Sequence, residues 1–159
     1  MFRIGTGFDV HAFKPGNKIH LCGIEIPFDK SLAGHSDADV ALHALTDAIL
    51  GALALGDIGQ HFPDTDEKWK GADSVVFLNW SLEQAKQRNF MLSNVDLTII
   101  CEKPRVNSYR EKLLLNLSKI CSMERDKINV KATTTERLGF TGREEGIASI
   151  CSVLMHEIK

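Results

Sequence analysis

The sequence has 159 residues, with 19 lysines and arginines against 21 acidic residues, a net charge of −2 and 43% hydrophobic residues. This length fits one domain, which we assign to residues 1–159. The charge balance argues against nucleic acid as the main partner, because nucleic-acid binding usually needs a basic face. It does not exclude a small phosphorylated ligand.

Four cysteines each lie in an apolar run and form no C-x-x-C pair: Cys22, Cys101, Cys121 and Cys151. Reduced, buried thiols are therefore favoured over disulfides or a thiol nucleophile. The first residues show no apolar signal region, and the most apolar stretch, Ala48–Leu55, falls well short of the ~20 residues that span a bilayer. We therefore expect a cytoplasmic protein without a membrane partner.

The first part of the chain alternates short strands with one long helix. Strands are expected over Arg3–Asp9, Lys18–Cys22 and Gly23–Pro27. The apolar spacing then predicts a helix over Ser36–Leu55, with Ser36 as its N-cap and Asp39 completing a capping box. A polar loop follows over Asp57–Asp73, and loops of this length without structure of their own are often functional.

The second part continues the alternation. Helices are expected over Ser74–Asn89 and Ser108–Ser122, and strands over Val95–Cys101, Ile128–Thr134 and Gly146–Ile158. This order predicts an α/β fold of the α+β sandwich type, with one mixed β-sheet and helices packed on one face.

Three residues form a candidate metal site. Asp9 and His11 close the first expected strand, and side chains two residues apart on a strand point to the same face. They can converge on one ion while Val10 points into the core. His43, about two turns into the expected helix, is the third candidate. One carboxylate and two imidazoles suit zinc and leave a fourth position open, as in catalytic sites.

The same residues allow a simpler interpretation. A D-x-H pair is common without a metal, and His43 could be a core histidine satisfied by Asp39 or Asp47, its neighbours one turn away. Asp47 could also orient the imidazole of a metal-binding His43.

Two segments carry groups that suit a phosphate. The free N–H groups at the start of the helix that follows Gly34 could hold one, with His35 as a donor, although capping by Ser36 alone is equally consistent. Thr133–Glu136 offers a run of hydroxyls and amides, with Glu136 as a magnesium ligand, and also matches a capping box.

Two further segments have less specific patterns. Asp57–Asp66 is dense in acids and could accept hydrogen bonds from sugar hydroxyls, or be a solvated loop. Arg143 follows a glycine turn and could bind phosphate through its planar fork, or be a surface arginine. The phosphate-loop pattern, the full dinucleotide fingerprint, G-x-S-x-G and H-E-x-x-H do not occur.

Taken together, these segments resemble the 2-C-methyl-D-erythritol 2,4-cyclodiphosphate synthase family, in the family's order and over essentially the whole chain. The resemblance rests on Gly7–His11, His35–Asp37, Asp57–Gly59, Phe62–Asp66, Lys131–Glu136 and Gly139–Arg143. Cys101–Val106 departs in its side chains from the Ala-Gln-x-Pro-Lys form often seen there, which changes little if backbone groups read the cytosine.

The resemblance implies a phosphorus–oxygen lyase of the non-mevalonate (MEP) pathway of isoprene biosynthesis. It would convert 4-diphosphocytidyl-2-C-methyl-D-erythritol 2-phosphate to 2-C-methyl-D-erythritol 2,4-cyclodiphosphate and CMP by metal-assisted intramolecular phosphoryl transfer. It also implies a homotrimer with active sites between neighbouring subunits and a central cavity where related proteins hold an isoprenoid diphosphate.

The resemblance also implies roles for individual residues. Asp9, His11 and His43 would bind one zinc ion per active site, and Glu136 would help hold magnesium or manganese. His35 and Thr134 match positions that stabilise the transition state. Further ligand contacts, the last two in the central cavity, are implied for Ser36, Asp57, Ile58, Gly59, Phe62, Asp64, Asp66, Cys101, Lys103, Pro104, Val106, Thr133, Thr135, Phe140 and Arg143.

Two other functions stay open. A zinc phosphohydrolase would use the same three ligands to activate water. A non-catalytic trimeric protein that senses nucleotides or isoprenoid diphosphates would bind without releasing CMP. The enzyme is favoured, because the three zinc candidates and Glu136 supply two cation sites where simple binding would need one at most.

Overall fold

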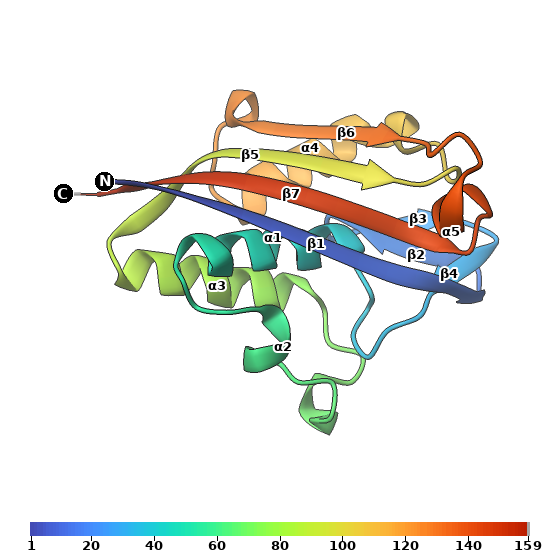
Figure 1. Ribbon diagram of the computed structural model, residues 1–159, viewed down its shortest axis with the longest axis horizontal. Coiled ribbons are helices and arrows are strands. Elements are labelled where there is room, and N and C mark those ends of the chain that lie inside the picture. The colour runs from blue at the N-terminus through green and yellow to red at the C-terminus, as the bar shows by residue number, and fades with distance from the viewer. Residues whose placement is uncertain (159) are drawn as a thin grey trace.

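Two long strands, distant in sequence, form the centre of the molecule. In the computed structural model, which describes residues 1–158, β1 (Phe2–Pro15) pairs antiparallel with β7 (Gly146–Glu157) from Phe2 opposite His156 to Ala12 opposite Gly146. Figure 1 shows the two strands running side by side along the longest axis of the molecule. The remaining strands are added on either side of this pair.

Three more strands complete a five-stranded sheet. They are β4 (Lys30–Leu32), β5 (Phe90–Ile100) and β6 (Ile128–Thr133), and the order is β4-β1-β7-β5-β6. β5 and β6 run parallel, whereas the other neighbours are antiparallel, so the sheet is mixed, as predicted. A separate hairpin is formed by β2 (Lys18–Leu21) and β3 (Ile24–Pro27).

Helices cover one face of the sheet, which confirms the predicted fold class. The longer ones are α1 (Val40–Ala52), α3 (Val75–Gln87) and α4 (Arg110–Ile120). The short ones are α2 (Ile58–His61), α5 (Gly139–Gly142) and the 3₁₀ helices Glu67–Trp69, Val106–Ser108 and Arg125–Lys127. No helix in residues 1–158 is both long and apolar enough to cross a membrane.

Helix α1 is the centre of the core. Eleven of its 13 residues are buried, because β1 and β7 lie along one side of the helix and α3 along another. A helix enclosed on most sides consists almost entirely of apolar residues. This holds for α1 except for a few polar residues such as His43 and Asp47. A polar side chain that α1 carries inward therefore needs specific partners.

Asp39, not Ser36, caps α1, so the predicted capping box at Ser36 was wrong. The Asp39 carboxylate accepts hydrogen bonds from the backbone N–H groups of Ala41 (3.2 Å) and Leu42 (3.0 Å). It also accepts from Cys22 (3.0 Å) and from the neighbouring glycine, both in the β2–β3 turn. The fully buried carboxylate thus joins the hairpin to the helix, and Ala38, in the left-handed region with φ 58°, keeps the preceding segment out of the helix.

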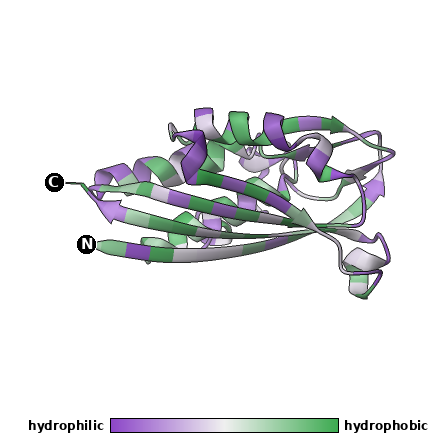
Figure 2. Cartoon of the chain, turned by 90° about the horizontal axis from the view of Figure 1, so that it is seen from above, coloured by the Kyte–Doolittle hydropathy of each residue, from purple (hydrophilic) through white to green (hydrophobic). Residues whose placement is uncertain are grey.

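The second face of the sheet carries exposed apolar side chains. Successive strand residues alternate between faces, and Figure 2 shows apolar and polar residues alternating along the long strands. Because Asp9 and His11 face the helices, Val10 points to the opposite face and is 37% exposed, so its predicted burial was wrong. Phe8 and Ile150, paired across β1 and β7, share this open face.

Glycines allow β1 to lie directly against α1. A Cβ atom at Gly5 would lie 1.8 Å from the Ala48 carbonyl oxygen and 2.6 Å from the Ala52 nitrogen.

We expect Gly5→Ala to destabilise the metal-free protein by about 1–3 kcal/mol, or roughly 3–10 °C in Tm, because the helix must move away. Gly51→Ala, in α1 with no atom nearer than 4.0 Å, is the matched control. It should raise stability by about 0.5–1 kcal/mol through helix propensity. Equal Tm values for Gly5→Ala and wild type would contradict this account.

Candidate metal centre and adjoining pockets

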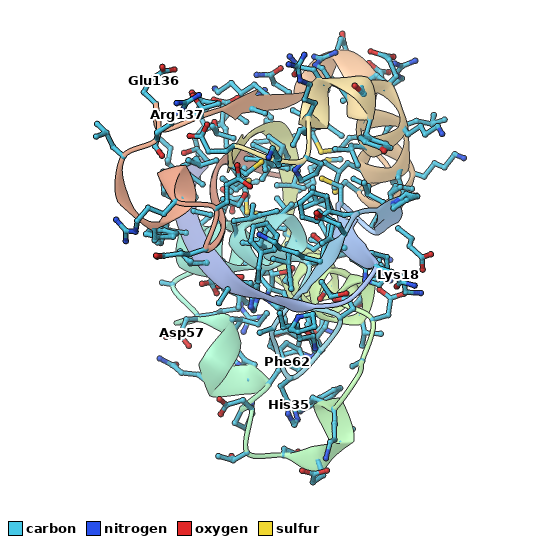
Figure 3. All side chains as sticks on the ribbon, turned by 90° about the vertical axis from the view of Figure 1, so that its right-hand side faces the viewer. Lys18, His35, Asp57, Phe62, Glu136 and Arg137 are labelled. Atoms are coloured by element: carbon cyan, nitrogen blue, oxygen red, sulfur yellow. The ribbon has the colours of Figure 1, made fainter. Side chains whose placement is uncertain are left out.

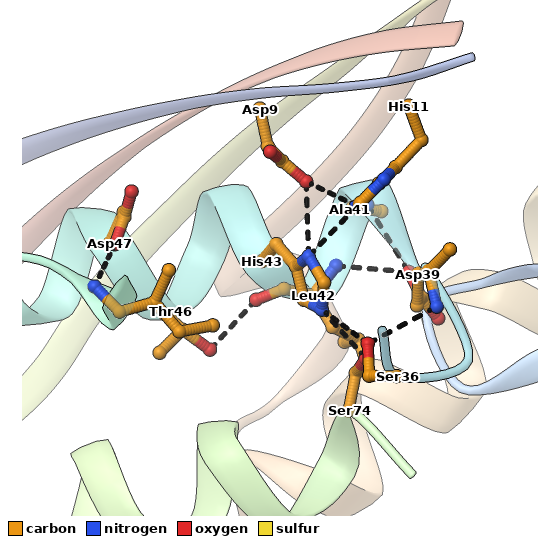
Figure 4. Close-up of polar contacts among 12 residues, drawn as sticks. Asp9, His11, Ser36, Asp39, Ala41, Leu42, His43, Thr46, Asp47 and Ser74 are labelled. Carbon is orange, nitrogen blue, oxygen red and sulfur yellow. Dashed lines mark hydrogen bonds and ion pairs between the residues drawn. The ribbon is translucent and has the colours of Figure 1, made fainter. Parts of the chain in front are cut away.

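The structure brings Asp9, His11 and His43 together on the helix-facing side of β1. The Asp9 Oδ2 atom lies 3.0 Å from His11 Nε2 and 3.1 Å from His43 Nδ1, and the two nitrogens are 3.0 Å apart. Figure 4 shows the three side chains converging from β1 and α1. Within residues 1–158 they are the one group of three histidine, cysteine or acidic side chains with this geometry.

This donor set fits a tetrahedral metal such as zinc. Zinc–ligand bonds of 2.0–2.2 Å separate neighbouring ligand atoms in a tetrahedron by roughly 3.3–3.6 Å. The three donors already lie at 3.0–3.1 Å from one another, so a small outward movement would let them coordinate a common ion. Two nitrogens and one carboxylate oxygen leave a fourth position for a substrate oxygen.

Each histidine is oriented by its second ring nitrogen. His11 Nδ1 lies 2.7 Å from the carbonyl oxygen of Ala33, which can only accept, so Nδ1 carries a hydrogen and, in the neutral imidazole, Nε2 is free to bind a metal. His43 Nε2 lies 2.8 Å from Ser74 Oγ and 3.2 Å from Ser36 Oγ, and its Nδ1 faces the other two candidates. Neither Asp39 nor Asp47, the sequence-based alternatives, contacts the His43 ring.

Asp47 has a different role. Its carboxylate accepts a hydrogen bond from the backbone N–H of Ile58 at 2.7 Å, which fixes the start of α2 against α1. The prediction that Asp47 orients the His43 imidazole was therefore wrong. Asp57 caps the same short helix by accepting from Gln60 N at 2.9 Å.

Burial and neighbouring groups shift the pKa values of Asp9 and His11. Burial by itself raises the pKa of Asp9, but the hydrogen bonds and charges of His11 and His43 in their protonated forms outweigh burial and hold the pKa well below its usual range. Burial by itself lowers the pKa of His11, and the hydrogen bond and charge of Asp9 outweigh it, so that pKa is raised. The carboxylate is therefore ionised near neutral pH, which is the form that binds a cation.

A cavity of about 440 Å³ adjoins the two histidines. It is lined by residues of β1, α1, α2, α3 and the segments that connect them: His11, His35, Ser36, His43, Ile58, Gly59, Phe62, Pro63, Asp64, Thr65, Trp69 and Phe77. Of the predicted ligand contacts from the first half of the chain, Ser36, Ile58, Gly59, Phe62 and Asp64 lie here, together with His35. Asp57 and Asp66 are not among the lining residues.

Aromatic rings form one wall of this cavity. The Phe62 ring centroid lies 4.6 Å from that of Phe77 and 5.0 Å from that of Trp69. His35 Nε2 contacts the backbone carbonyl oxygen of Asp66 at 3.0 Å, which ties the start of the α1 segment to the acidic loop. The loop predicted over Asp57–Asp73 thus contains α2 and a 3₁₀ helix and is anchored on both sides of the cavity.

A second pocket, of about 830 Å³, lies at the ends of β5 and β6. It is lined by Cys101, Glu102, Lys103, Pro104, Arg105, Val106, Asn107, Ser108, Ala132, Thr133, Thr134, Arg137, Gly142 and Glu144. The predicted cytidine contacts, which are Thr133 and the segment Cys101–Val106, are all in this list. Thr135, a predicted ligand contact, is not. The pocket does not include any of the three metal candidates.

The loop after β6 is held by a carboxylate that sequence reasoning missed. Glu102 Oε1 accepts from the backbone N–H groups of Thr135 and Arg137, both at 3.2 Å. Between them, Glu136 has φ 53° in the left-handed region, and its carboxylate accepts from Thr134 Oγ1 at 2.9 Å. No helix begins here, so the capping-box interpretation of Thr133–Glu136 was wrong.

The metal candidates and the Thr133–Glu136 loop lie on different sides of one chain. Figure 3 shows Glu136 at the opposite end of the view from His35 and Phe62. Arg143 forms a two-point ion pair with Glu145 at 2.8 and 3.1 Å, and Phe140 is 38% exposed. The structure therefore groups the predicted site residues into two sets, which a single chain does not bring together.

Comparisons with known proteins agree with these features. The model of the YgbB family matches residues 2–156. A protein of Roseobacter denitrificans named 2-C-methyl-D-erythritol 2,4-cyclodiphosphate synthase is 54% identical over 153 residues, 96% of each chain. The solved structure of the Plasmodium falciparum IspF CDP complex superposes with a TM-score of 0.88 at 30% identity, over 99% of this chain and 97% of that one.

Several relatives are longer. The bifunctional enzyme IspD/IspF of Paracoccus denitrificans is 58% identical over 153 residues, which are 96% of this chain and 40% of that protein. The chain thus spans about 40% of the length of such relatives. The family match over nearly the whole chain, and the relative of equal length, lead to one conclusion: this chain belongs to the YgbB family, the family of the 2-C-methyl-D-erythritol 2,4-cyclodiphosphate synthases.

Proposed function

We propose that this protein is a 2-C-methyl-D-erythritol 2,4-cyclodiphosphate synthase. It would convert 4-diphosphocytidyl-2-C-methyl-D-erythritol 2-phosphate to the cyclic diphosphate and CMP, as a phosphorus–oxygen lyase of the MEP pathway. The observation that carries the proposal is the convergence of Asp9, His11 and His43 beside a cavity lined by three of the predicted methylerythritol contacts, Ser36, Gly59 and Asp64. Residues 1–159 would form one catalytic domain, and the four free cysteines favour the cytoplasm.

The proposal includes two cations. Zinc would be held by Asp9, His11 and His43, and magnesium or manganese by Glu136 together with the substrate diphosphate. When bound, these ions would neutralise charge on the diphosphate and polarise its phosphoryl oxygens. The exposed Glu136 carboxylate, with one hydrogen bond from Thr134, has capacity left for a cation ligand.

The chain's own residues would act by positioning. An oxygen of the substrate's 2-phosphate forms a bond to the β-phosphorus, and the bond from that phosphorus to the CMP oxygen breaks, so no protein nucleophile is needed. Holding both ends of the substrate makes this attack intramolecular, and effective molarities of such reactions reach about 10⁵–10⁸ M. His35 and Thr134 would donate hydrogen bonds to the phosphoryl oxygens.

The two sets of residues would hold the two ends of the substrate. Ser36, Asp57, Ile58, Gly59, Phe62, Asp64 and Asp66 would contact the methylerythritol phosphate, and Cys101, Lys103, Pro104, Val106, Thr133 and Thr135 the cytidine diphosphate arm. Since these sets lie on different sides of one chain, the proposal requires a site shared between neighbouring subunits.

A homotrimer is part of the proposal. The open face of the sheet exposes large apolar side chains, including Ile4 (75% exposed) and Phe8 (55%), and such patches mark interfaces. Association through this face would bring the Thr133–Glu136 loop of one subunit near the metal centre of the next. Phe140 and Arg143 would line a central cavity suited to an isoprenoid diphosphate.

Product analysis tests the reaction. Purified protein given the cytidine diphosphate substrate in ¹⁸O-water should release CMP and an unlabelled cyclic diphosphate, because water is not the attacking group. Label in the product would identify a phosphohydrolase, and binding without CMP release would identify a sensor.

His43→Ala should lower turnover by about 10³-fold or more, since a bound metal supplies several kcal/mol of transition-state stabilisation.

Metal content tests the three ligands. Asp9→Ala should reduce zinc from about one ion per chain to near zero after dialysis, because two imidazoles alone form an incomplete site. Asp29→Ala, which removes an exposed carboxylate from the turn after β3, is the matched control and should keep wild-type zinc. Elemental analysis by mass spectrometry gives the stoichiometry. Full zinc occupancy in Asp9→Ala would refute the assignment.

Sedimentation tests the assembly. Ile150→Asp should convert the trimer to monomers and abolish turnover, because it buries a charge in the proposed interface. Leu115→Asp changes a 44% exposed leucine on α4, on the helix-covered side of the sheet, and should leave the trimer intact. A monomeric wild-type protein with full turnover would contradict the shared site.

A further inference from the structure

Ser74 lies where a helix N-cap residue normally uses its side chain, yet it does not cap its helix. It directly precedes α3, and its hydroxyl makes no capping hydrogen bond. The side chain is fully buried and points instead to His43 Nε2, at 2.8 Å. Behind it, Asp37 accepts hydrogen bonds from the Ser74 hydroxyl and from the Ser74 backbone N–H, the latter at 3.1 Å.

The Asp37 carboxylate determines which atom donates in each hydrogen bond of the series Asp37–Ser74–His43. The Ser74 hydroxyl has a single hydrogen and donates it to the Asp37 carboxylate. Ser74 Oγ can then act toward His43 Nε2 only as an acceptor. His43 Nε2 must therefore carry a hydrogen. In the neutral imidazole this leaves Nδ1 bare, and Nδ1 is the atom that faces Asp9 and His11.

We propose that Ser74, held by Asp37, is a positioning residue that fixes the metal-binding tautomer and the ring orientation of His43. Ser36 also lies 3.2 Å from the same nitrogen, but its oxygen accepts from Ala38 N and has no carboxylate behind it. It therefore cannot impose a tautomer in the same way. This inference deepens the proposed function, because it rests on zinc binding by Asp9, His11 and His43.

The arrangement parallels that of His11. There a backbone carbonyl oxygen, that of Ala33, accepts from Nδ1 and leaves Nε2 for the metal. Opposite ring nitrogens of the two histidines thus face the same point, each selected by an acceptor on the far side of its ring. Hydrogen-bond partners of this kind typically change metal affinity by about 10–100-fold when they are removed.

The first test is zinc affinity, measured on the full chain by competition with a chromophoric chelator. Ser74→Ala should weaken zinc binding by about 10–100-fold, and Ser74→Thr, which keeps the hydroxyl, should restore most of it. Ser81→Ala is the matched control, because Ser81 is also fully buried on α3 and donates to the Leu78 carbonyl oxygen at 2.8 Å, away from His43. It should leave zinc affinity unchanged.

The second test separates tautomer control from general support of the fold. Asp37→Asn keeps the size of the side chain, but its amide can donate to Ser74, whose hydroxyl is then free to donate to His43 Nε2. The ¹⁵N shifts of His43 in metal-free, histidine-labelled protein, recorded at a pH where the imidazole is neutral, should show hydrogen on Nε2 in wild type and a shift toward Nδ1 in Asp37→Asn. Zinc affinity should fall in parallel, with Tm of the metal-free protein nearly unchanged.

The outcomes are distinguishable. If wild-type protein fails to bind zinc at all, the proposed metal centre itself is wrong. If wild type binds zinc and Ser74→Ala binds it equally tightly, or the His43 tautomer is the same in Asp37→Asn, this inference is overturned and the proposed function stands. If Ser81→Ala weakens zinc binding as much as Ser74→Ala, the effect is general loosening of α3, which also overturns it.

Discussion

The close contact between β1 and α1 is the constraint on which the metal centre depends. Glycines at positions 5 and 7 let the strand lie against the helix backbone, with no room for a Cβ atom at either position. Only at this separation can the side chains of Asp9 and His11 reach the ring of His43 across the interface. The same contact buries α1 almost completely, so each polar group that α1 carries inward has to be satisfied by a neighbour.

The sequence could predict the features that follow from regular spacing of side chains along a strand or a helix. Two-residue alternation on β1 was enough to bring Asp9 and His11 to one face, and helical spacing identified α1, α3 and α4 within a few residues. The same alternation should have excluded burial of Val10, since a residue between two helix-facing neighbours must point the other way. Ser36 and Asp39 are both good caps by type, and only the β2–β3 turn, 16 residues away, decides between them.

Other parts of the site depend on contacts that no local pattern encodes. Ser74 reaches His43 across 31 residues, and Glu102 reaches the loop at Thr135 across 33. In the sequence Ser74 is an ordinary helix start, and Glu102 is part of a segment that departs from the family's usual form. The Glu102 Oε1 atom accepts hydrogen bonds from two backbone N–H groups, so residue 102 contributes a hydrogen-bond acceptor to the structure. Backbone shape in the Thr133–Glu136 loop can therefore be kept while the residue type changes.

The pairing of β1 with β7 also bears on how the protein folds. The three metal candidates lie within the first 43 residues, but the strand that carries two of them is paired along most of its length with residues 146–156. Contacts between residues so distant in sequence close a long loop, which slows folding in proteins of this size. During synthesis, β1 and the apolar surface of α1 must wait for the β7 segment. The metal centre can thus be completed only after residues 146–156 have been synthesised and have paired with β1.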